Sequence, residues 1–540
     1  MLGQMTQMPL LISSQIQFAQ KFHPRVEVVT RTVEGPIHRS DWGEIARRSK
    51  KLANALIALG IRPGDRVATV AWNTHRHLEL YFAVSGIGAV LHTVNPRLPP
   101  EQLCYILDHA GDVALFFDTT FLKLAQIAQK QPLPLKHFFA LTDAEHLPAD
   151  AGMPGLRDYE SLIAPHVDHF DWPIFDENTA SSLCYTSGTS GHPKGVLYSH
   201  RSTVLHSYAA AMVDSLGICA ADVTLPVVPM FHVNAWGVPY AAAMVGSKLV
   251  LPGPGMDGKS LLELIENEKV TSLLGVPTVW LGLLAHMRAV GHTLTHVKKV
   301  TIGGAACPPS MIDAFEKEHG ARVIHAWGMT ETSPIGTVNA LLPKHQDLPP
   351  AEQMAVKRKQ GRPIFGVDLR LVDDAHNVVP HDGETSGHLQ IRGPWVAHSY
   401  FKRDRDEAHD DEWFYTGDIA TLDPDGYMQI TDRSKDVIKS GGEWISSIDL
   451  ENAAMGHPKV AQAAAIGIAH HKWQERPLLL VVKQPGQELS REEVLEFLEK
   501  RLVKWWMPDA VEFIEALPLG ATGKVLKREL RAKFKDYTLG

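Results

Sequence analysis

Amphipathic helix patterns alternate with short strand patterns rich in Val, Ile and Leu along most of the chain before Gly383. The run IARRSKKLANALIALG (45–60) predicts a helix ended by its last glycine, and DRVATVAW (65–72) predicts the strand after it. The same order returns at 261–277. Because strands separated by helices pair in parallel and are covered on both faces, we predict an α/β architecture. The stretch 340–362 loses the periodicity and is expected to be an irregular surface excursion.

The pattern changes after Gly383, where short strand patterns alternate in twos. Asp425-Gly426 is a tight-turn signal between two of them. At 540 residues the chain is too long for one hydrophobic core. The polar run TDRSKD (431–436) separates strand patterns and is the best candidate for a boundary. We therefore predict a large N-terminal domain over residues 1–431 and a small α+β domain over 432–540, joined by a hinge.

Charge and composition exclude several functional classes. With 53 Lys and Arg against 61 Asp and Glu, the net charge is −8 and no basic block stands out, which argues against nucleic acid as the main partner. No basic residue precedes Lys21, so a secretory signal is not expected, and no apolar run approaches the ~18–20 residues of a membrane helix. The four scattered cysteines form no CxxC pair, which favours neither a zinc site nor a disulfide framework. We expect a cytoplasmic protein that acts on small molecules.

One loop has the composition of a phosphate site: YTSGTSGHPKG (185–195) combines glycines, hydroxyls and Lys194. Backbone N–H groups, hydroxyls and a lysine suit a polyphosphate. The Walker A pattern fails because Pro193 and Gly195 flank the lysine, and the dinucleotide pattern G-x-G-x-x-G is absent from this loop. A strand pattern, GVLYS, comes next, so the loop joins two strands instead of opening a helix. The alternative interpretation is a flexible loop without a ligand.

The same stretch resembles the phosphate-loop signature of the adenylate-forming superfamily, which includes acyl-CoA synthetases, luciferases and the adenylation domains of peptide synthetases. Further motifs typical of that superfamily occur in order: VPMFHVNAWG (228–237), GGAA (303–306), WGMTET (327–332), YTGDIA (415–420), DRSKDVIKSGGEWIS (432–446) and GATGKVLKREL (520–530). The resemblance covers the chain from about Ser182 onward. It implies an N-terminal domain of layered α/β subdomains with a small β-barrel, and a mobile C-terminal domain.

The resemblance also implies a reaction and an ATP site. A carboxylate attacks the α-phosphate of Mg²⁺-bound ATP, and coenzyme A then attacks the acyl-adenylate. The residues implied to bind phosphate are Thr186, Ser187, Gly188, Thr189, Ser190, Gly191 and Lys194. Those implied to line the adenine and acyl sites are Gly303, Gly304, Ala305, Trp327, Gly328, Met329 and Thr330. Thr186 and Glu331 are the implied Mg²⁺ ligands, Asp418 and Arg433 the ribose contacts, and Lys435 and Lys439 further nucleotide-contacting cations.

The C-terminal domain has two implied roles. Lys524 bridges the carboxylate and the α-phosphate during adenylation, which makes it the principal catalytic residue. The domain then rotates about Asp432 and presents a different face to the thiol of coenzyme A. That face contains Gly441, Gly442, Glu443, Trp444 and Glu475, and Gln474 stands where a glycine is common in the family.

The acid-binding wall is implied by FHVNAWG, where His232 is a catalytic and substrate residue and Trp236 a gate, with Gly303 and Trp327 opposite. Peptide-synthetase domains place an aspartate near this segment, and its absence disfavours amino acids. Together with KWWMPD (504–509), the segment is most similar to medium- and long-chain fatty acid–CoA ligases, close to members that activate 3-methylmercaptopropionate. We expect a short- or medium-chain acid and a homodimer. Alternatives are a long-chain acid, a luciferase-like monooxygenase and an inactive scaffold.

Overall fold

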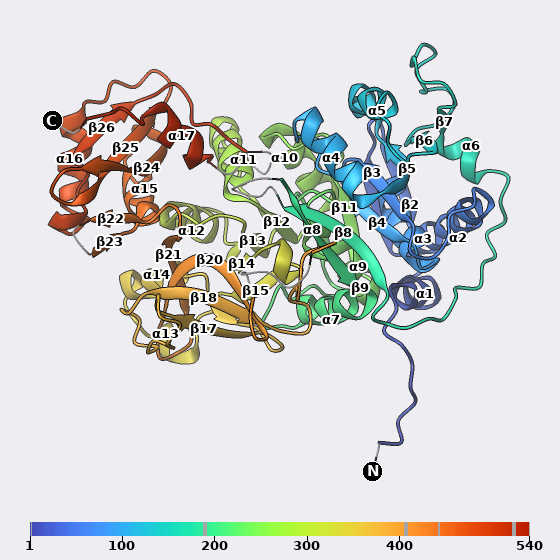
Figure 1. Cartoon of the computed structure of the whole chain (residues 1–540), viewed down its shortest axis with the longest axis horizontal. Helices are drawn as coiled ribbons and strands as arrows, with labels where there is room; N and C mark the ends of the chain where they lie inside the picture. The colour runs from blue at the N-terminus through green and yellow to red at the C-terminus, as the bar shows by residue number, and fades with distance from the viewer. Residues whose placement is uncertain (2, 187–191, 404–408, 441–442, 521–524, 539–540) are drawn as a thin grey trace.

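The structure is a computed structural model that describes residues 1, 3–186, 192–403, 409–440, 443–520 and 525–538 (Figure 1). Two sheets with mainly parallel strands lie side by side in the N-terminal part, as helix–strand alternation predicts. The first has the order β7-β6-β5-β3-β4-β8-β9. Its strands are β3 (Arg66–Val70), β4 (Val90–Thr93), β5 (Asp112–Phe117), β6 (His137–Ala140), β7 (Arg157–Asp158), β8 (Ala180–Thr186) and β9 (Lys194–Ser199).

The second sheet has the order β16-β15-β14-β13-β12-β10-β11-β1-β2. Its strands are β1 (Glu27–Arg31), β2 (Ile37–Asp41), β10 (Val223–Pro226), β11 (Lys248–Leu251), β12 (Ser272–Gly275), β13 (Lys299–Ile302), β14 (Arg322–Gly328), β15 (Ile335–Val338) and β16 (Arg362–Pro363). The six strands from β14 to β1 pair in parallel, and antiparallel strands extend both edges. Their carboxyl ends therefore share one edge, where ligands bind in open α/β sheets.

Helices cover these sheets, and several begin where the sequence supplies a cap. Asp41 accepts the backbone N–H of Glu44 at 2.7 Å at the start of one helix, as an N-cap does. The main helices are α1 (Ile12–Phe22), α2 (Trp42–Ala58), α3 (His75–Gly86), α4 (Pro100–Ala110), α5 (Leu122–Gln129), α7 (His200–Ala211), α9 (Val238–Val245), α10 (Gly258–Glu268) and α11 (Pro277–Val290). The helix and strand predicted at 45–60 and 65–72 are confirmed to within a few residues by α2 and β3.

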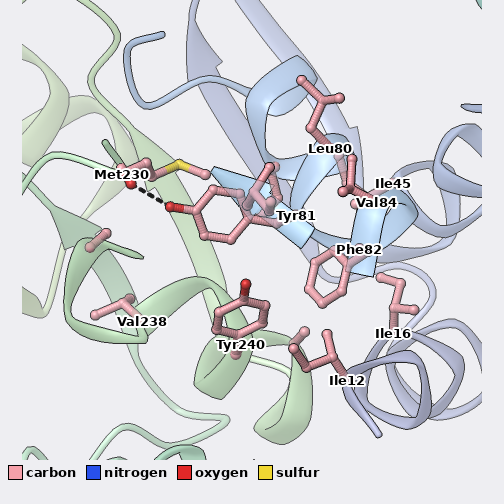
Figure 2. Packing of buried hydrophobic residues seen from close by; sticks show 14 of the residues in the cluster. Ile12, Ile16, Ile45, Leu80, Tyr81, Phe82, Val84, Met230, Val238 and Tyr240 are labelled. Atoms are coloured by element: carbon pink, nitrogen blue, oxygen red, sulfur yellow. Dashed lines mark hydrogen bonds between the residues drawn. The ribbon is translucent and has the colours of Figure 1, made fainter. Parts of the chain in front are cut away.

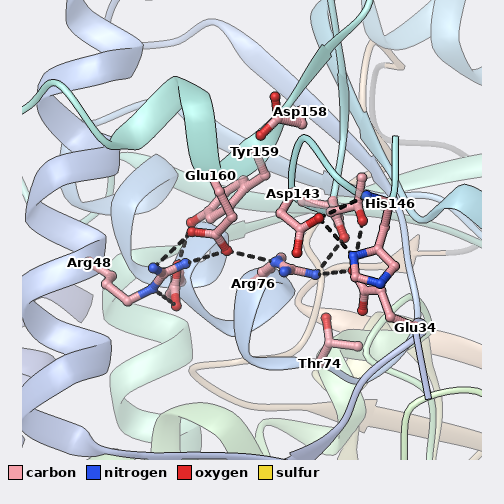
Figure 3. Close-up of polar contacts among 12 residues, drawn as sticks. Glu34, Arg48, Thr74, Arg76, Asp143, His146, Asp158, Tyr159 and Glu160 are labelled. Atoms are coloured by element: carbon pink, nitrogen blue, oxygen red, sulfur yellow. Dashed lines mark hydrogen bonds and ion pairs between the residues drawn. The ribbon is translucent and has the colours of Figure 1, made fainter. Parts of the chain in front are cut away.

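The core of the N-terminal part brings together helices that are far apart in the sequence (Figure 2). Tyr81 of α3 and Tyr240 of α9 are fully or nearly fully buried, with ring centroids 5.4 Å apart. A network of ion pairs joins α3 to its neighbours (Figure 3). There Arg48 contacts Glu79 at 2.7 Å, and Arg76 contacts Glu160 at 2.8 Å. Because each buried charge has a partner of opposite sign, the network fixes how α2, α3 and α6 (Tyr159–Ile163) pack.

A third, antiparallel sheet lies where the sequence implied a small β-barrel. Its strands are β17 (Asp368–Val372), β18 (Gly387–Arg392), β19 (His409–Asp410), β20 (Trp413–Leu422) and β21 (Met428–Arg433). The stretch 340–362 lies mostly at the surface, as expected, but it is not irregular throughout. Two short helices form there, α13 (Pro343–Gln346) and α14 (Pro350–Lys357), each begun by a proline at its first position.

The C-terminal part has its own sheet and its own apolar clusters. The sheet contains β22 (Ile438–Ser440), β23 (Glu443–Ile445), β24 (Val460–His470), β25 (Gln474–Lys483) and β26 (Ala510–Phe513), with α15 (Ser447–Met455), α16 (Arg491–Glu499) and α17 (Lys527–Lys533) beside it. This is the small α+β unit predicted from the sequence. The predicted boundary between residues 431 and 432 falls within β21 and stays a prediction.

Candidate active site

The phosphate-type loop is the connection of a β-hairpin. Its described ends, Thr186 and Lys194, face each other in the antiparallel ladder of β8 and β9, which confirms that the loop joins two strands. The ammonium of Lys194 lies 4.4 Å from the centroid of the Tyr400 ring, within the range of a cation–π contact. The predicted phosphate residues Ser187, Gly188, Thr189, Ser190 and Gly191 lie outside the described residues.

Glu331, the predicted Mg²⁺ ligand, is buried at 5% exposure in a 3₁₀ turn (Thr330–Thr332) that comes after β14. The hydroxyl of Tyr400 donates a hydrogen bond to its Oε1 at 2.6 Å. Burial raises the pKa of Glu331, and the Tyr400 hydroxyl and the charges of Arg433 and Lys194 partly offset that rise.

The carboxylate of Glu331 and the hydroxyl of Thr186 are both hard-oxygen donors of the kind that Mg²⁺ prefers. Because Mg²⁺ keeps several waters and takes further ligands from phosphates, one protein carboxylate suffices. Among the described residues, no three His, Cys, Asp or Glu side chains group closely enough to form a self-contained metal site. The residues present therefore fit an ion that arrives together with ATP.

Three residues predicted to contact the nucleoside lie together. Asp418 on β20 is 2% exposed on its side chain, and its two oxygens meet different donors. Trp327 donates its indole N–H to Oδ2 at 3.1 Å, and the Arg433 guanidinium pairs with Oδ1 at 2.8 Å. A carboxylate has about four lone-pair positions, so Asp418 retains acceptor capacity for hydroxyl groups. The motifs predict one site for these residues but not their bonds to each other.

The predicted acid-binding wall contains a close approach between Gly303 and the Trp236 ring. A Cβ atom on Gly303 would lie 3.1 Å from the Trp236 ring and 3.0 Å from the carbonyl oxygen of Ala326. Any larger residue at this position would require the indole or the backbone at Ala326 to shift by a few tenths of an ångström. The predicted substrate residues Gly303 and Trp236 are thus in contact, and Trp327 lies on the adjacent strand β14.

A cavity of about 10 Å³, room for about one water molecule, lies between the predicted acid-binding segment and the start of the predicted phosphate loop. Its lining residues are Thr93, Asn95, Leu98, Ile106, Tyr185, Thr186 and His232. Thr186 begins the phosphate loop, and His232 begins the segment that carries Trp236. The cavity therefore places a residue predicted to bind phosphate beside one predicted to bind the acid.

The predicted residues of the C-terminal part are only partly described. Lys435 and Lys439 have exposed side chains. The backbone N–H of Lys439 donates to Oε2 of Glu475 at 2.9 Å, so this carboxylate holds β22 against β25. Gln474 adopts φ +72°, the left-handed conformation that glycine adopts without strain. Lys524, Gly441 and Gly442 lie outside the described residues, and for Trp444 only the backbone, in β23, is described.

Two side chains that contact the turn around Glu331 belong to no motif that assigns them a role. Tyr400 stands in HSYFKR, outside every motif, and is brought to Glu331 by the segment after β18. Tyr198 of β9 donates its hydroxyl to the carbonyl oxygen of Thr330 at 2.6 Å and so fixes the turn that carries Glu331. No periodicity or spacing in the sequence marks either tyrosine, because each acts through a contact between distant segments.

Comparisons with known proteins decide the family. The profile of the AMP-binding enzyme family matches residues 17–401, and that of the AMP-binding enzyme C-terminal domain matches residues 449–524. The chain belongs to the AMP-binding enzyme family. It is 56% identical to 3-methylmercaptopropionyl-CoA ligase of Ruegeria lacuscaerulensis over 540 residues, which cover 100% of both chains. It is 52% identical to medium-chain-fatty-acid–CoA ligase of Ectopseudomonas oleovorans, over 100% of this chain and 98% of that one.

The fold matches solved members of the family. The crystal structure of ATP-bound MatB from Rhodopseudomonas palustris superposes with a TM-score of 0.82 at 25% identity, covering 98% of this chain and 99% of that one. These findings confirm the predicted family, the two-part α/β fold and the class of acid–thiol ligase. No described helix is both long and apolar enough to cross a membrane.

Proposed function

We propose that the chain is an ATP-dependent, AMP-forming acyl-CoA ligase that activates a short- or medium-chain acid, with 3-methylmercaptopropionate as the first candidate. The observation that carries the proposal is that Thr186 and His232 line the same small cavity. The start of the predicted phosphate loop thus lies beside the predicted acid-binding segment, as adenylation of a carboxylate requires. The full-length similarity to a 3-methylmercaptopropionyl-CoA ligase supports the choice of acid.

In the first half-reaction, a carboxylate oxygen attacks the α-phosphorus and pyrophosphate leaves. Lys194 and the loop 186–191 bind the β- and γ-phosphates, and Glu331 with Thr186 would hold Mg²⁺, which would supply positive charge to these phosphates. Asp418, oriented by its bonds to Trp327 and Arg433, accepts the ribose hydroxyls. Lys524 bridges the carboxylate and the α-phosphate. No protein nucleophile takes part, so positioning and charge stabilisation supply the catalysis.

In the second half-reaction, the thiol sulfur of coenzyme A attacks the acyl carbonyl carbon and AMP leaves, while the thiol proton passes to solvent. Residues 432–540 rotate about Asp432 between the two steps. The pivot is supported by the bond from the backbone N–H of Ser447, in the first turn of α15, to Oδ2 of Asp432 at 2.7 Å. Gly441, Gly442 and Trp444 line the path of the thiol, and Glu475 keeps that segment in place through Lys439.

The working form that we propose is a cytoplasmic homodimer. All four cysteines are free thiols, which suits a reducing compartment. Light scattering after size-exclusion chromatography measures the mass directly, and a single species at the monomer mass would contradict the dimer.

The proposal is tested by product analysis of reactions that contain ATP, Mg²⁺ and one acid, with and without coenzyme A. The acids run from acetate to palmitate and include 3-methylthiopropanoate, the anion of the first candidate. AMP, pyrophosphate and a thioester in equal amounts are expected, most efficiently with the short thioether acid. A preference for palmitate would instead assign a long-chain ligase, and an oxygen-dependent product would assign a monooxygenase. ADP as the nucleotide product would contradict adenylation.

A further inference from the structure

We propose that Asn234 is a positioning residue that holds the acid-binding wall in a left-handed turn and thereby sets the selectivity among acids. The inference rests on the proposed function, because it concerns the acid that this site activates. The turn is α8 (Val233–Trp236), which begins directly after His232 and ends in Trp236.

The backbone of this turn is unusual for the residues that form it. Val233, Asn234, Ala235 and Trp236 have φ values of 46°, 51°, 49° and 58°, and Gly237 continues the run at 72°. L-residues other than glycine avoid this region, and β-branched valine avoids it most strongly. Such a conformation persists only where the surroundings over-determine it, and it clusters at functional sites. Something in the structure must therefore hold the four residues in place.

The side-chain amide of Asn234 supplies such a hold. Asn234 is 5% exposed, and its Nδ2 donates to the hydroxyl oxygen of Ser182 at 2.9 Å. On the other side, its Oδ1 lies 3.4 Å from the hydroxyl of Thr93 and 3.5 Å from the thiol of Cys184. Ser182 and Cys184 belong to β8, the strand that leads into the phosphate loop. The amide thus clamps the turn to the strand that positions Thr186.

The segment before the turn is fixed independently. Asn73 donates from Nδ2 to the carbonyl oxygens of Pro226 and Val228, each at 2.9 Å, and accepts the N–H of Met230 at 2.7 Å. The hydroxyl of Tyr81 donates to the carbonyl oxygen of Met230 at 2.5 Å (Figure 2). The same hydroxyl lies 3.5 Å from Oδ1 of Asn234, but its one proton is directed to the much nearer Met230 carbonyl, so the shorter contact of the amide is the one to Ser182. The chain thus reaches His232 on a rigid path, and the turn sets the direction of the chain from there to Trp236.

The direction of the turn decides where the acid-binding wall lies. Trp236 packs against Gly303, and His232 lines the pocket that contains Thr186. The nucleoside contacts of Asp418 come from β14, β20 and β21, whereas the described partners of Asn234 lie on β4, β8 and α3. Loosening the turn should therefore change binding of the acid more than binding of ATP, because none of these nucleoside contacts involves Asn234.

The test compares Asn234→Gly with Ala235→Gly. The first removes the amide while the backbone keeps free access to φ > 0, and the second relieves strain at the next residue with the amide intact. Initial rates with a series of acids give KM for each acid, KM for ATP and kcat. For Asn234→Gly we expect KM for the preferred acid to rise about three- to tenfold, the loss of one buried hydrogen bond. The ratio of kcat/KM between short and long acids should fall by a similar factor, with KM for ATP within about twofold of the wild type.

Ser182→Ala removes the same hydrogen bond from the other side and keeps the test decisive if Asn234→Gly fails to fold. The double variant should lose no more than Asn234→Gly alone, since both substitutions break one bond. An acid ranking for Asn234→Gly that equals that of Ala235→Gly would overturn the inference. So would equal rises in KM for acid and ATP, which indicate general loosening. If the wild type forms no thioester from any acid, the proposed function itself fails and the inference falls with it.

Discussion

Replacing Tyr400 by phenylalanine removes one hydrogen bond from the carboxylate that we assign to Mg²⁺. The ring remains, and with it the contact to Lys194, whose ammonium lies 4.4 Å from the ring centroid. The substitution deletes the 2.6 Å bond from the hydroxyl to Oε1 of Glu331. The ionised form of Glu331 therefore loses a donor at a site where burial already disfavours the charge.

The size of the effect is set by the charge of the acceptor. A hydrogen bond to a charged group contributes about 1.5–3 kcal/mol, which corresponds to about 10- to 150-fold in an equilibrium constant. Because the hydroxyl stabilises the carboxylate and not the carboxylic acid, its removal raises the pKa of Glu331 further. We expect kcat/KM for Mg²⁺-bound ATP to fall by that factor at low pH, and the acid limb of its pH profile to move to higher pH.

The assay is continuous detection of pyrophosphate between pH 5 and 9 at saturating acid, with Mg²⁺ varied. Tyr198→Phe is the matched control, because its hydroxyl donates to the backbone carbonyl of Thr330 at 2.6 Å and not to a carboxylate. That control should keep the acid limb of the wild type. If the Tyr400→Phe profile coincides with that of Tyr198→Phe, Tyr400 does not act through Glu331 and the reasoning is refuted.

Three further predictions concern the wall, the hinge and the C-terminal sheet. Gly303→Ala brings a Cβ to 3.1 Å from the Trp236 ring, so kcat/KM for the acid should fall by the equivalent of about 1–3 kcal/mol. Steady-state rates measure this, and an unchanged kcat/KM would mean that the indole moves aside at no cost. Burial raises the pKa of Asp432 to about 6, so the folded state binds this proton more tightly than the unfolded state does. Its contribution to stability is therefore full below about pH 4 and is lost as the pH rises to about 6, a change of about 3 kcal/mol. Urea unfolding of wild type minus Asp432→Asn should show that decline, and a flat difference would contradict it. Gln474→Gly removes a side chain from φ +72° and should raise the free energy of unfolding by about 0.5–1 kcal/mol in urea melts; a loss of stability would mean that the side chain itself contributes.

The sequence predicts the fold well because the spacing of apolar residues, and the order of helices and strands that it indicates, can be read directly from the sequence. Alternating helix and strand patterns specify parallel sheets, and the strand pattern after Lys194 predicts that the loop joins two strands, as β8 and β9 show. The helices within 340–362 are not predicted because 4 and 8 residues are too few to show a clear helical period.

The residues of the site are predicted from the sequence only where they belong to a motif typical of the family. The bond from Trp327 to Asp418 joins positions 91 apart, and Tyr400 reaches Glu331 across 69 positions, so neither contact has a local signal. The left-handed turn at Val233 and Ala235 has a backbone conformation that these residues disfavour. The buried side-chain amide of Asn234 holds the turn by a hydrogen bond to Ser182, on a strand distant in the sequence. Contacts of this kind become visible when the packed structure brings the segments together.

The most direct test of the adenylate route uses an acid labelled with ¹⁸O in both carboxylate oxygens. Mass spectrometry of the products from ATP, coenzyme A and labelled 3-methylthiopropanoate traces where each oxygen goes. Attack on the α-phosphate transfers one labelled oxygen to AMP and leaves the other in the thioester carbonyl. Unlabelled AMP, or label in inorganic phosphate beside ADP, would contradict the acyl-adenylate and with it the roles proposed for Glu331 and Lys524.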